Sequence, residues 1–561
     1  MKRQSILTGA SIMMVAALLS RVLGWVRDRA IGHFWGSTGH TDAYWAAFGV
    51  PDLLYYLLAG GAISAALIPI FTGYMVRQQE EESWRVANTL VTVLTVCAAT
   101  GIAIIVIFAP QLVLLVAPGF VAKRGPAAAA ECAGYVRIVA PMVFFTVLSA
   151  LFTGILQAHR HFTAPAMAWL VYNFGIIAGA YAGGGWVARR YHDDQLGLKV
   201  LCAGVVAGAF LLVVVQVPSL LARGFRYRPS FELGHPGVRE IARIFLPIMA
   251  GLAFTQICLL WLPSFFGSYF QEGAITSLRY ANRLVVLPLG LWGIAISTAA
   301  FPVMAERIAM GQVDEFRRLF SALLRAVLFL AVPSAAALIA LAGPMLRLLW
   351  RSGRMNESAI TMAEFCLLYY AISLIGLSGL QIVNRAFYSL KDGRTPALVG
   401  IGYTALIVVG TVVAMRAHSR LQYATIAALT SVGVTVGFLV LLELFRQRLG
   451  GVDGRAIAAS FLRVVFAAAL AAAAAYWVSG LVGHRLGVPV THFITSASQV
   501  AAATSARGSN AGVAAQVFLS LGTGALVYLA ALTAMGAPEI ASFRSAVRQR
   551  LGASAQTAPI A

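Results

Sequence analysis

Charged residues are scarce in this 561-residue chain, because Asp, Glu, Lys and Arg together make up only 11% of it. A soluble protein of this size carries about twice that share. Acidic residues are the rarer kind, with 21 Asp and Glu against 42 Lys and Arg. Apolar residues supply 60% of the chain, and they recur in runs long enough to cross a bilayer. The composition excludes a soluble globular protein and indicates a polytopic membrane protein.

Cysteine is also scarce, and its pattern argues against a disulfide framework or a zinc site. The five cysteines lie in or beside apolar runs, and no Cys-x-x-Cys pair occurs. The sequence has no GxxxxGK[ST] nucleotide-binding motif and no HExxH zinc motif. It also has no Ser/His/Asp set at a recognisable nucleophile elbow. We therefore expect no enzyme activity, no cofactor and no metal.

Hydropathy, with breaks at Gly, Pro and charge clusters, predicts an all-α membrane protein with fourteen spanning helices. The expected spans lie near residues 5–24, 43–74, 86–116, 132–156, 164–187, 199–221, 241–266, 274–303, 321–349, 360–388, 396–415, 422–444, 457–482 and 512–535. The second span is long and contains Pro51 and Pro69, which predicts a kink. The basic N-terminus and the apolar stretch after it lack a clear cleavage site, so we interpret them as an uncleaved first span.

The distribution of Lys and Arg predicts the orientation of the chain. If the N-terminus is cytoplasmic, the larger share of the 42 basic residues falls on the cytoplasmic side. Both termini are therefore predicted to be cytoplasmic, with 541–561 as a basic tail. The net charge of +21 is explained by basic loops that face anionic lipid head groups, so no nucleic-acid partner is expected.

Three short stretches recur in the same order, which indicates an internal repeat. AISAALIP is followed by AISTAAFP, PQLVLLVAPG by PMLRLLWRSG, and FTAPA by GRTPA, each pair 231 to 234 residues apart. A repeat of six spans restores the direction through the membrane, so the halves are parallel. We expect two six-helix lobes, 1–222 and 223–446, around a central cavity, with an additional helix pair at 447–540.

Several charges fall inside the expected spans or at their ends. A charge at mid-bilayer costs roughly 2.5–3.5 kcal/mol, so such residues usually face a cavity or a partner. Arg279 and Arg283 are four residues apart and share one helical face. Guanidinium groups suit phosphate oxygens. We expect Arg21, Arg27 and Arg283 to line a water-filled cavity that holds an anionic, phosphorylated substrate.

Arg21 and Arg27 are six residues apart, so one straight helix would not place them on the same face. Either the helix loosens at Gly24, or one of the two arginines lies on the following loop. A structural alternative for Arg21 is an ion pair with Asp28 or Asp42.

Structural alternatives also exist for the other charges. Arg27 is alternatively a long side chain that reaches the membrane interface, and Arg29 is expected there. Arg283 alternatively forms an ion pair with Asp52 of the other half. Glu364, near the start of its span, is expected at the interface.

The stretches SRVLGWVRD, TDAYWAAFGVPDLL and GGAISAALIPIF, in that order, resemble the opening of the MurJ/MviN family of lipid II flippases. YANRLVVLPLGLWGIAISTAAFP resembles the matching stretch of that family's second half. The family belongs to the multidrug/oligosaccharidyl-lipid/polysaccharide exporter superfamily. The resemblance covers nearly the whole chain and is specific mainly in residues 20–70 and 280–302.

The resemblance implies a transporter of the bacterial cytoplasmic membrane that serves peptidoglycan synthesis. Such a protein moves lipid II to the outer face by alternating access, and a groove beside spans 13 and 14 holds the polyprenyl tail. The family's cavity arginines, which hold the diphosphate, map to Arg21, Arg27 and Arg283, and its motif aspartate maps to Asp42. The implied partners are lipid II or a similar polyprenyl-diphosphate lipid, membrane lipids and proteins of cell-wall synthesis.

Departures from the family's pattern keep other functions open. Tyr55 replaces an arginine, Gly60-Gly61 replaces Glu-Gly, and Asn282 replaces an aspartate. The alternatives are an exporter of another polyprenyl-diphosphate saccharide and a transport-dead scaffold of the cell-wall machinery. The residues expected to line or gate the cavity are Asp28, Asp42, Asp52, Tyr55, Arg279 and Asn282.

Overall fold

The structure is a computed structural model that describes residues 6–59, 62–243, 245, 261–488, 509–537 and 540. Over these residues the chain is helical and forms no strand, apart from an isolated bridge between Ser352 and Met355. The chain forms two compact units. Unit 1 is Met1–Thr276 with Trp350–Ala359, and unit 2 is Ser277–Leu349 with Ile360–Ala561.

Eleven helical segments in the described part of the chain are long and apolar enough to cross a membrane. They correspond to the third to sixth and the eighth to fourteenth expected spans. The first expected span is a single helix, the second is divided, and the seventh, near 241–266, lies mainly outside the described residues. The all-α polytopic class predicted from the sequence is confirmed.

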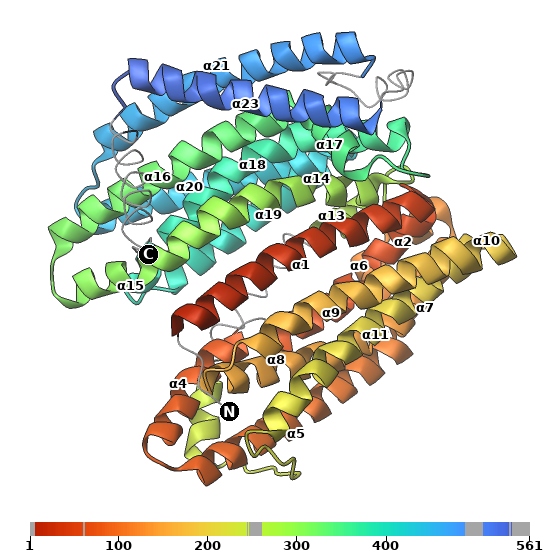
Figure 1. The fold of residues 1–561 in the computed structure, drawn as a ribbon, viewed down its shortest axis with the longest axis vertical. Helices are drawn as coiled ribbons and strands as arrows, with labels where there is room; N and C mark the ends of the chain where they lie inside the picture. The colour runs from red at the N-terminus through yellow and green to blue at the C-terminus, as the bar shows by residue number, and fades with distance from the viewer. Residues whose placement is uncertain are drawn as a thin grey trace, which may run out of the picture. The chain divides into compact units, whose positions relative to one another are not determined.

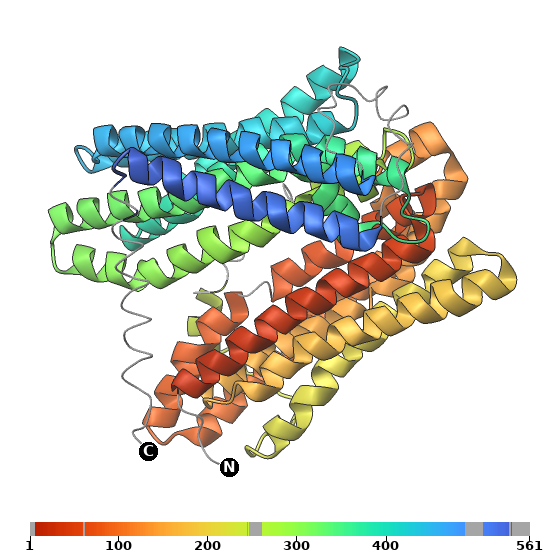
Figure 2. The same ribbon diagram turned by 45° about the horizontal axis from the view of Figure 1, so that its top comes forward.

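Unit 1 is built around long helices from the first half of the sequence (Figures 1 and 2). Its elements, of which the two named η are π-helical, are α1 (Ile6–Trp35), α2 (Gly39–Ala46), α3 (Gly49–Leu58), α4 (Ala62–Val76), α5 (Glu80–Ile107), α6 (Ala109–Val116), η1 (Phe120–Arg124), α7 (Pro126–Val139), α8 (Met142–Ala158), α9 (Thr163–Ala180), η2 (Tyr181–Val187), α10 (Ala188–Tyr191), α11 (Asp194–Leu221) and α13 (Leu262–Gly267). α9 lies beside both α1 and α11.

Glycines allow α9 and α11 to approach each other closely. A Cβ atom added to Gly175 of α9 would lie 2.4 Å from the Cα of Gly208 on α11. A Cβ on Gly179 would lie 2.8 Å from the Cα of Gly204. Small residues at such contacts let helix backbones pack directly, which is a main source of helix association in membranes.

The first two expected spans differ from their predicted form. α1 continues past the predicted end at residue 24 to Trp35, so Gly24 does not interrupt it and Arg27 lies on the helix. The second span is divided into α2, α3 and α4. Its first break comes just before Pro51, which lies in the first turn of α3, where a proline costs no intrahelical hydrogen bond.

Unit 2 takes up the chain within α14 (Ala274–Pro288), whose first turn belongs to unit 1. The elements that follow are η4 (Leu289–Ile294, π-helical), α15 (Ala295–Ala309), α16 (Val313–Ala340), α17 (Ala342–Trp350), α18 (Glu357–Ser389), α19 (Arg394–Arg416), α20 (Ala424–Arg448), α21 (Gly454–Leu486) and α23 (Asn510–Ala534). Phe445 lies in the core of unit 2. The centroid of its ring is 4.5 Å from that of Phe320 and 5.3 Å from that of Phe387. α21 and α23 lie side by side, and α21 packs on α16 (Figure 1).

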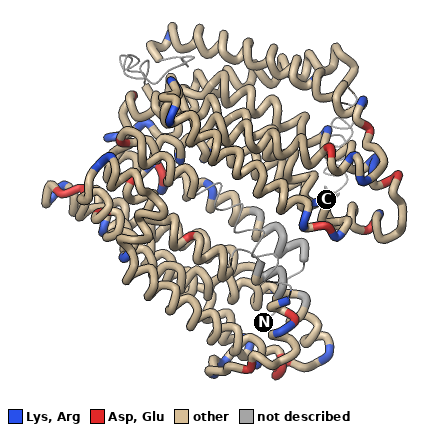
Figure 3. Tube along the Cα trace, turned by 180° about the vertical axis from the view of Figure 1, so that it is seen from behind, with Lys and Arg blue, Asp and Glu red and all other residues tan. Residues whose placement is uncertain are grey.

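Charged residues gather at the helix ends and connecting loops, while the long middle portions of the helices carry few of them (Figure 3). Large apolar side chains such as Phe174, Trp477 and Phe518 are exposed on the helices. A helix surface of this kind suits a hydrocarbon surrounding, because lipid covers the exposed apolar side chains.

Candidate functional site

Polar side chains join α1 to α9 in unit 1. Arg27 donates from Nε and Nη2 to Oδ1 of Asp28 at 2.9 and 2.8 Å, and from Nη1 to Oδ1 of Asn173 at 3.2 Å. Asn173 in turn donates from Nδ2 to Oγ of Ser20 at 3.2 Å. Asp28 is buried, whereas the Arg27 side chain keeps 14% of its surface exposed. These hydrogen bonds hold the Arg27 guanidinium in place, and part of the side chain remains exposed.

Arg21 lies on the same helix, and its side chain is exposed. The alternative in which Arg21 pairs with Asp28 or Asp42 is not found. Asp28 instead binds Arg27, and Asp42 binds Arg124. Because α1 is continuous, Arg21 and Arg27 are on one helix but not on one face of it.

Asp42 is fully buried in unit 1, where its carboxylate accepts four hydrogen bonds. Oδ2 accepts from Nη2 of Arg124 at 2.9 Å and from the backbone N–H of Gly273 at 2.8 Å. Oδ1 accepts from the backbone N–H and the hydroxyl of Thr276 at 2.8 and 2.7 Å. Four donors and an arginine suit an ionised carboxylate. Asp42 therefore ties α2 to η1 and to the first turn of α14.

Asp52 and Tyr55 lie on α3 and are half-buried. The Tyr55 ring packs edge to face against Tyr56, with centroids 5.3 Å apart. A neutral aromatic side chain therefore occupies the position where the family pattern has an arginine. Gly60-Gly61, where the family pattern has Glu-Gly, lies outside the described residues.

In unit 2, α14 turns a polar face away from the packed interior. Arg279, Asn282 and Arg283 are half-buried, whereas Leu284 is buried. The spacing of three and four residues places these polar side chains on one face, which continues to the exposed Val286. The sequence prediction that Arg279 and Arg283 share a face agrees with this helix.

Two charges that we expected at the membrane interface make defined contacts. Arg29 donates from Nη2 to the carbonyl of Arg351 at 3.3 Å and lies 5.9 Å from the Trp25 ring centroid. Glu364 is fully buried on α18, with Oε2 3.8 Å from Nη2 of the buried Arg347. Glu364 is therefore part of the interior of unit 2.

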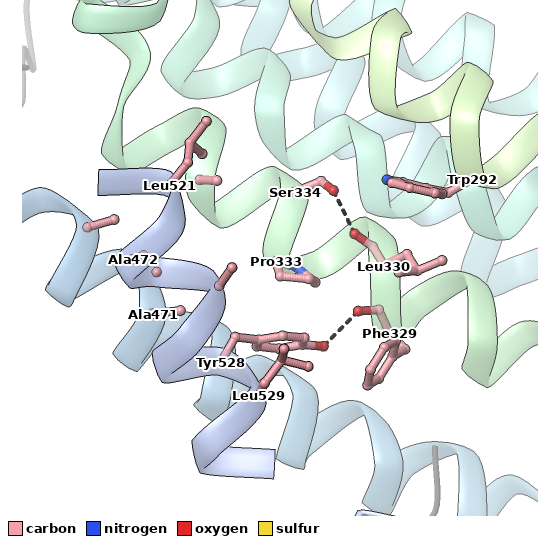
Figure 4. A pocket seen from close by; sticks show the side chains of 14 residues that line it. Trp292, Phe329, Leu330, Pro333, Ser334, Ala471, Ala472, Leu521, Tyr528 and Leu529 are labelled. Atoms are coloured by element: carbon pink, nitrogen blue, oxygen red, sulfur yellow. Dashed lines mark hydrogen bonds between the residues drawn. The ribbon is translucent and has the colours of Figure 1, made fainter. Parts of the chain in front are cut away.

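An apolar cavity of about 290 Å³ lies between α16, α21 and α23 in unit 2 (Figure 4). The hydroxyl of Tyr528 donates to the carbonyl of Phe329 at 2.6 Å, and that of Ser334 donates to the carbonyl of Leu330 at 2.7 Å. Small and apolar side chains complete the lining, including Pro333, Ala471, Ala472, Leu521 and Leu529. Because the hydroxyls are bonded to backbone, the cavity suits a hydrocarbon chain.

Sequence reasoning missed Asn173, Arg124 and Thr276, which hold the site residues in place. Asn173 carried a signal, because it is an isolated amide in an apolar run. Arg124 and Thr276 lie far along the chain from Asp42, and nothing in their local sequence marks them as its partners.

The described residues include no group of three His, Cys, Asp or Glu side chains that could hold a metal ion. Cys97, Cys132, Cys202 and Cys366 are free thiols. Cys258 lies outside the described residues.

A family model described as lipid II flippase MurJ matches residues 31–498 of this chain. The chain belongs to the MurJ family. A probable lipid II flippase MurJ from Rhizobium meliloti is 30% identical over 475 residues, which span 82% of this chain and 84% of the relative. MurJ relatives are named as flippases, which are transporters, so the expectation of a transporter rather than an enzyme is confirmed.

Solved structures agree with the MurJ assignment at the level of the fold. A lipid II flippase MurJ in an inward closed conformation matches with a TM-score of 0.72 and 19% identity, covering 93% of this chain and 98% of that one. An inward-facing multidrug resistance MATE transporter of the MOP superfamily matches with a TM-score of 0.61 and 14% identity, covering 78% of this chain and 98% of that one. An outward-facing MATE structure matches with a TM-score of 0.55 and 13% identity, covering 78% and 94%.

Proposed function

We propose that this protein flips lipid II from the cytoplasmic to the outer face of the bacterial cytoplasmic membrane by alternating access. Membership of the MurJ family supports the substrate, because relatives are named as lipid II flippases. The parallel internal repeat and the fold shared with inward- and outward-facing transporters support the alternating cycle. The excess of basic residues on one side supports cytoplasmic termini.

Accessible arginines on otherwise apolar helices are the observation that carries this proposal. Arg21 and Arg27 on α1 and Arg283 on α14 all keep exposed surface, although both helices are rich in apolar residues. Leaving a guanidinium in hydrocarbon is costly, so water-filled surroundings are favourable for these side chains. There these arginines hold the diphosphate through charge-assisted, bidentate hydrogen bonds.

The remaining site residues support the arginines. Asp28 orients Arg27 through two hydrogen bonds. Asp52, Tyr55, Arg279 and Asn282 line the cavity. Asp42 acts as a gating residue, because its four hydrogen bonds tie α2 to η1 and α14.

The apolar cavity beside α21 and α23 takes part of the polyprenyl tail. Its volume of about 290 Å³ and its apolar lining suit a segment of hydrocarbon chain. Cell-wall synthesis proteins are further partners in this proposal, since lipid II is consumed at the outer face.

The test is lipid II translocation in cells depleted of their own flippase. We expect the parent chain to restore translocation, and the double variant Arg27→Ala/Arg283→Ala to lose it by about tenfold or more, because each lost charge-assisted hydrogen bond is worth roughly 1.5–3 kcal/mol. Arg420→Ala serves as the control, because Arg420 is an exposed arginine in the loop after α19. It should translocate at the parent's rate.

Other outcomes would select the alternatives. A well-expressed parent that moves no lipid II would favour another polyprenyl-diphosphate saccharide as the substrate. Tyr55, which replaces the arginine of the family pattern, supports this alternative. Restored growth that does not change with the arginine substitutions would indicate a scaffold rather than a transporter.

A further inference from the structure

A second, polar cavity of about 460 Å³ lies within unit 1. Four segments enclose it: the end of α1, the stretch from η2 to the turn after α10, the start of α11, and the loop before α18. Its titratable and charged lining residues are His33, Arg189, His192, Asp194 and Arg354. The end of α1 therefore borders a concave site, and several segments supply hydrogen-bond donors to it.

Direct contacts hold the loop that closes this cavity. Nη1 of Arg354 lies 2.7 Å from both carboxylate oxygens of Asp194, and the backbone N–H of Arg354 donates to the carbonyl of His33 at 2.9 Å. Gly353 has a φ of +54°, and a Cβ there would lie 2.3 Å from the His33 carbonyl oxygen. Glycine is thus required for the loop to approach α1 this closely.

The cavity carries an excess of positive charge. Asp194 can balance only one of the two arginines, and it is paired with Arg354. The guanidinium of Arg189 lies 5.8 Å from the centroid of the Phe34 ring. A cation–π contact orients a guanidinium without neutralising it. His33 and His192 add nitrogens that can donate to an anion.

Exposed aromatic side chains place this site at the level of the lipid head groups. Tyr181, Trp186 and Tyr191 are 57%, 66% and 61% exposed on the helical run that ends beside the cavity. The same run is the end of the candidate membrane span Thr163–Tyr191. Tyr and Trp are enriched where a spanning helix meets the head groups.

We propose that this cavity binds the phosphate group of an anionic phospholipid head group, with Arg189 as its main ligand and Arg354 as the second. Phosphate oxygens match the planar fork of a guanidinium, so the two arginines suit the phosphate of a head group. The aromatic surround favours a lipid over free inorganic phosphate as the source of the group. This site is independent of the transported lipid, so it stands whether or not the protein flips lipid II.

The test counts lipids that remain bound to the purified full-length protein by native mass spectrometry. The protein is equilibrated with phosphatidylcholine micelles that contain increasing phosphatidylglycerol. Arg189→Gln removes the main ligand, and Arg190→Gln removes the neighbouring exposed charge, which does not line the cavity. We expect Arg189→Gln to lower the apparent affinity for phosphatidylglycerol about tenfold, in line with the loss of a charge-assisted hydrogen bond. Arg190→Gln should bind as the parent does.

Two further arms distinguish the source of the phosphate and the cause of any loss. Inorganic phosphate at millimolar concentration should not displace phosphatidylglycerol, and equal competition would overturn the assignment to a lipid. Equal losses in Arg189→Gln and Arg190→Gln would show diffuse surface charge and would overturn the cavity site. Thermal unfolding of both variants in phosphatidylcholine alone checks the fold, and it should match the parent because both side chains are exposed.

Discussion

The two halves of the repeat carry a glutamate at the same place but surround it differently. Glu131 of α7 and Glu364 of α18 each follow an alanine and lie 233 residues apart, which is the spacing of the repeat. Glu131 accepts from the hydroxyl of Tyr135 at 2.6 Å and contacts Nδ1 of the half-exposed His40 at 2.8 Å. Glu364 is fully buried beside the fully buried Arg347. One half therefore uses a titratable partner near solvent, and the other uses a permanent charge in its interior.

The fifth and sixth helices of each half show a second difference. In unit 1, Gly175 of α9 faces the backbone of Gly208 on α11. In unit 2, a Cβ on Gly410 of α19 would lie 3.1 Å from a terminal methyl of Leu429 on α20. The backbone of Gly208 cannot shift away from an added methyl group, whereas the side chain of Leu429 can. Gly175 and Gly410 thus differ in how well a larger residue would be tolerated.

Removing one buried charge should have the largest effect. Arg347→Met leaves Glu364 buried beside an apolar side chain, and such a loss costs about 3–5 kcal/mol. Glu131→Gln removes the charge of the corresponding glutamate in the other half, and it should cost under about 1 kcal/mol because its partner His40 is half-exposed. The measurement is the free energy of unfolding in detergent.

The double variant Arg347→Met/Glu364→Leu sharpens this comparison, because it removes both buried charges together. It should recover most of the lost stability. A double variant as unstable as Arg347→Met would show that Arg347 acts mainly through packing and its other contacts, and the contrast between the two glutamates would then not rest on charge.

Glycine substitutions should have the next largest effect. Gly175→Ala forces α9 and α11 apart, because its Cβ would lie 2.4 Å from a Cα atom, and we expect a loss of about 1–3 kcal/mol. Gly410→Ala should stay within about 1 kcal/mol of the parent, because Leu429 can shift and alanine favours the helix. Thermal unfolding of the two variants, measured in parallel, is the check. Equal losses would contradict the difference between these two glycine positions.

The sequence predicted the helical class and most of the spans, because apolar runs and their breaks are local features. It placed the end of α1 too early, since hydropathy falls at Arg27, Asp28 and Arg29. Those side chains bond to one another and to neighbouring segments, so the helix continues to Trp35. The charged residues end the apolar run of the first span, but α1 continues through them.

The partners within the candidate site could not be predicted from the sequence. Asp42 binds Arg124 and Thr276, which are distant in sequence and depend on how the chain folds back. The shared face of Arg279 and Arg283 could be predicted, because it depends only on helical spacing. Local geometry was accessible from the sequence, and tertiary pairing was not.

The smallest expected effect is a response to pH that only one half should show. The hydrogen bond to Glu131 raises the pKa of His40 above its ordinary value of 6.5, although partial burial opposes the shift. A raised pKa means that the stabilising contact is fully present below pH 6.5 and is lost as the pH rises through the higher value. Because His40 is half-exposed, solvent screening keeps its contribution under about 1 kcal/mol.

The measurement is the difference in thermal midpoint between the parent and His40→Gln, followed from about pH 5 to about pH 8, where histidine titrates. The parent's advantage should be largest at the acidic end and shrink toward the alkaline end. Arg347→Met, followed over the same range, should give no such trend, because this change removes no histidine. An advantage of the parent that grows with pH would mean that neutral rather than charged His40 is the form bound by Glu131, and the contrast between a titratable and a permanent partner would fail.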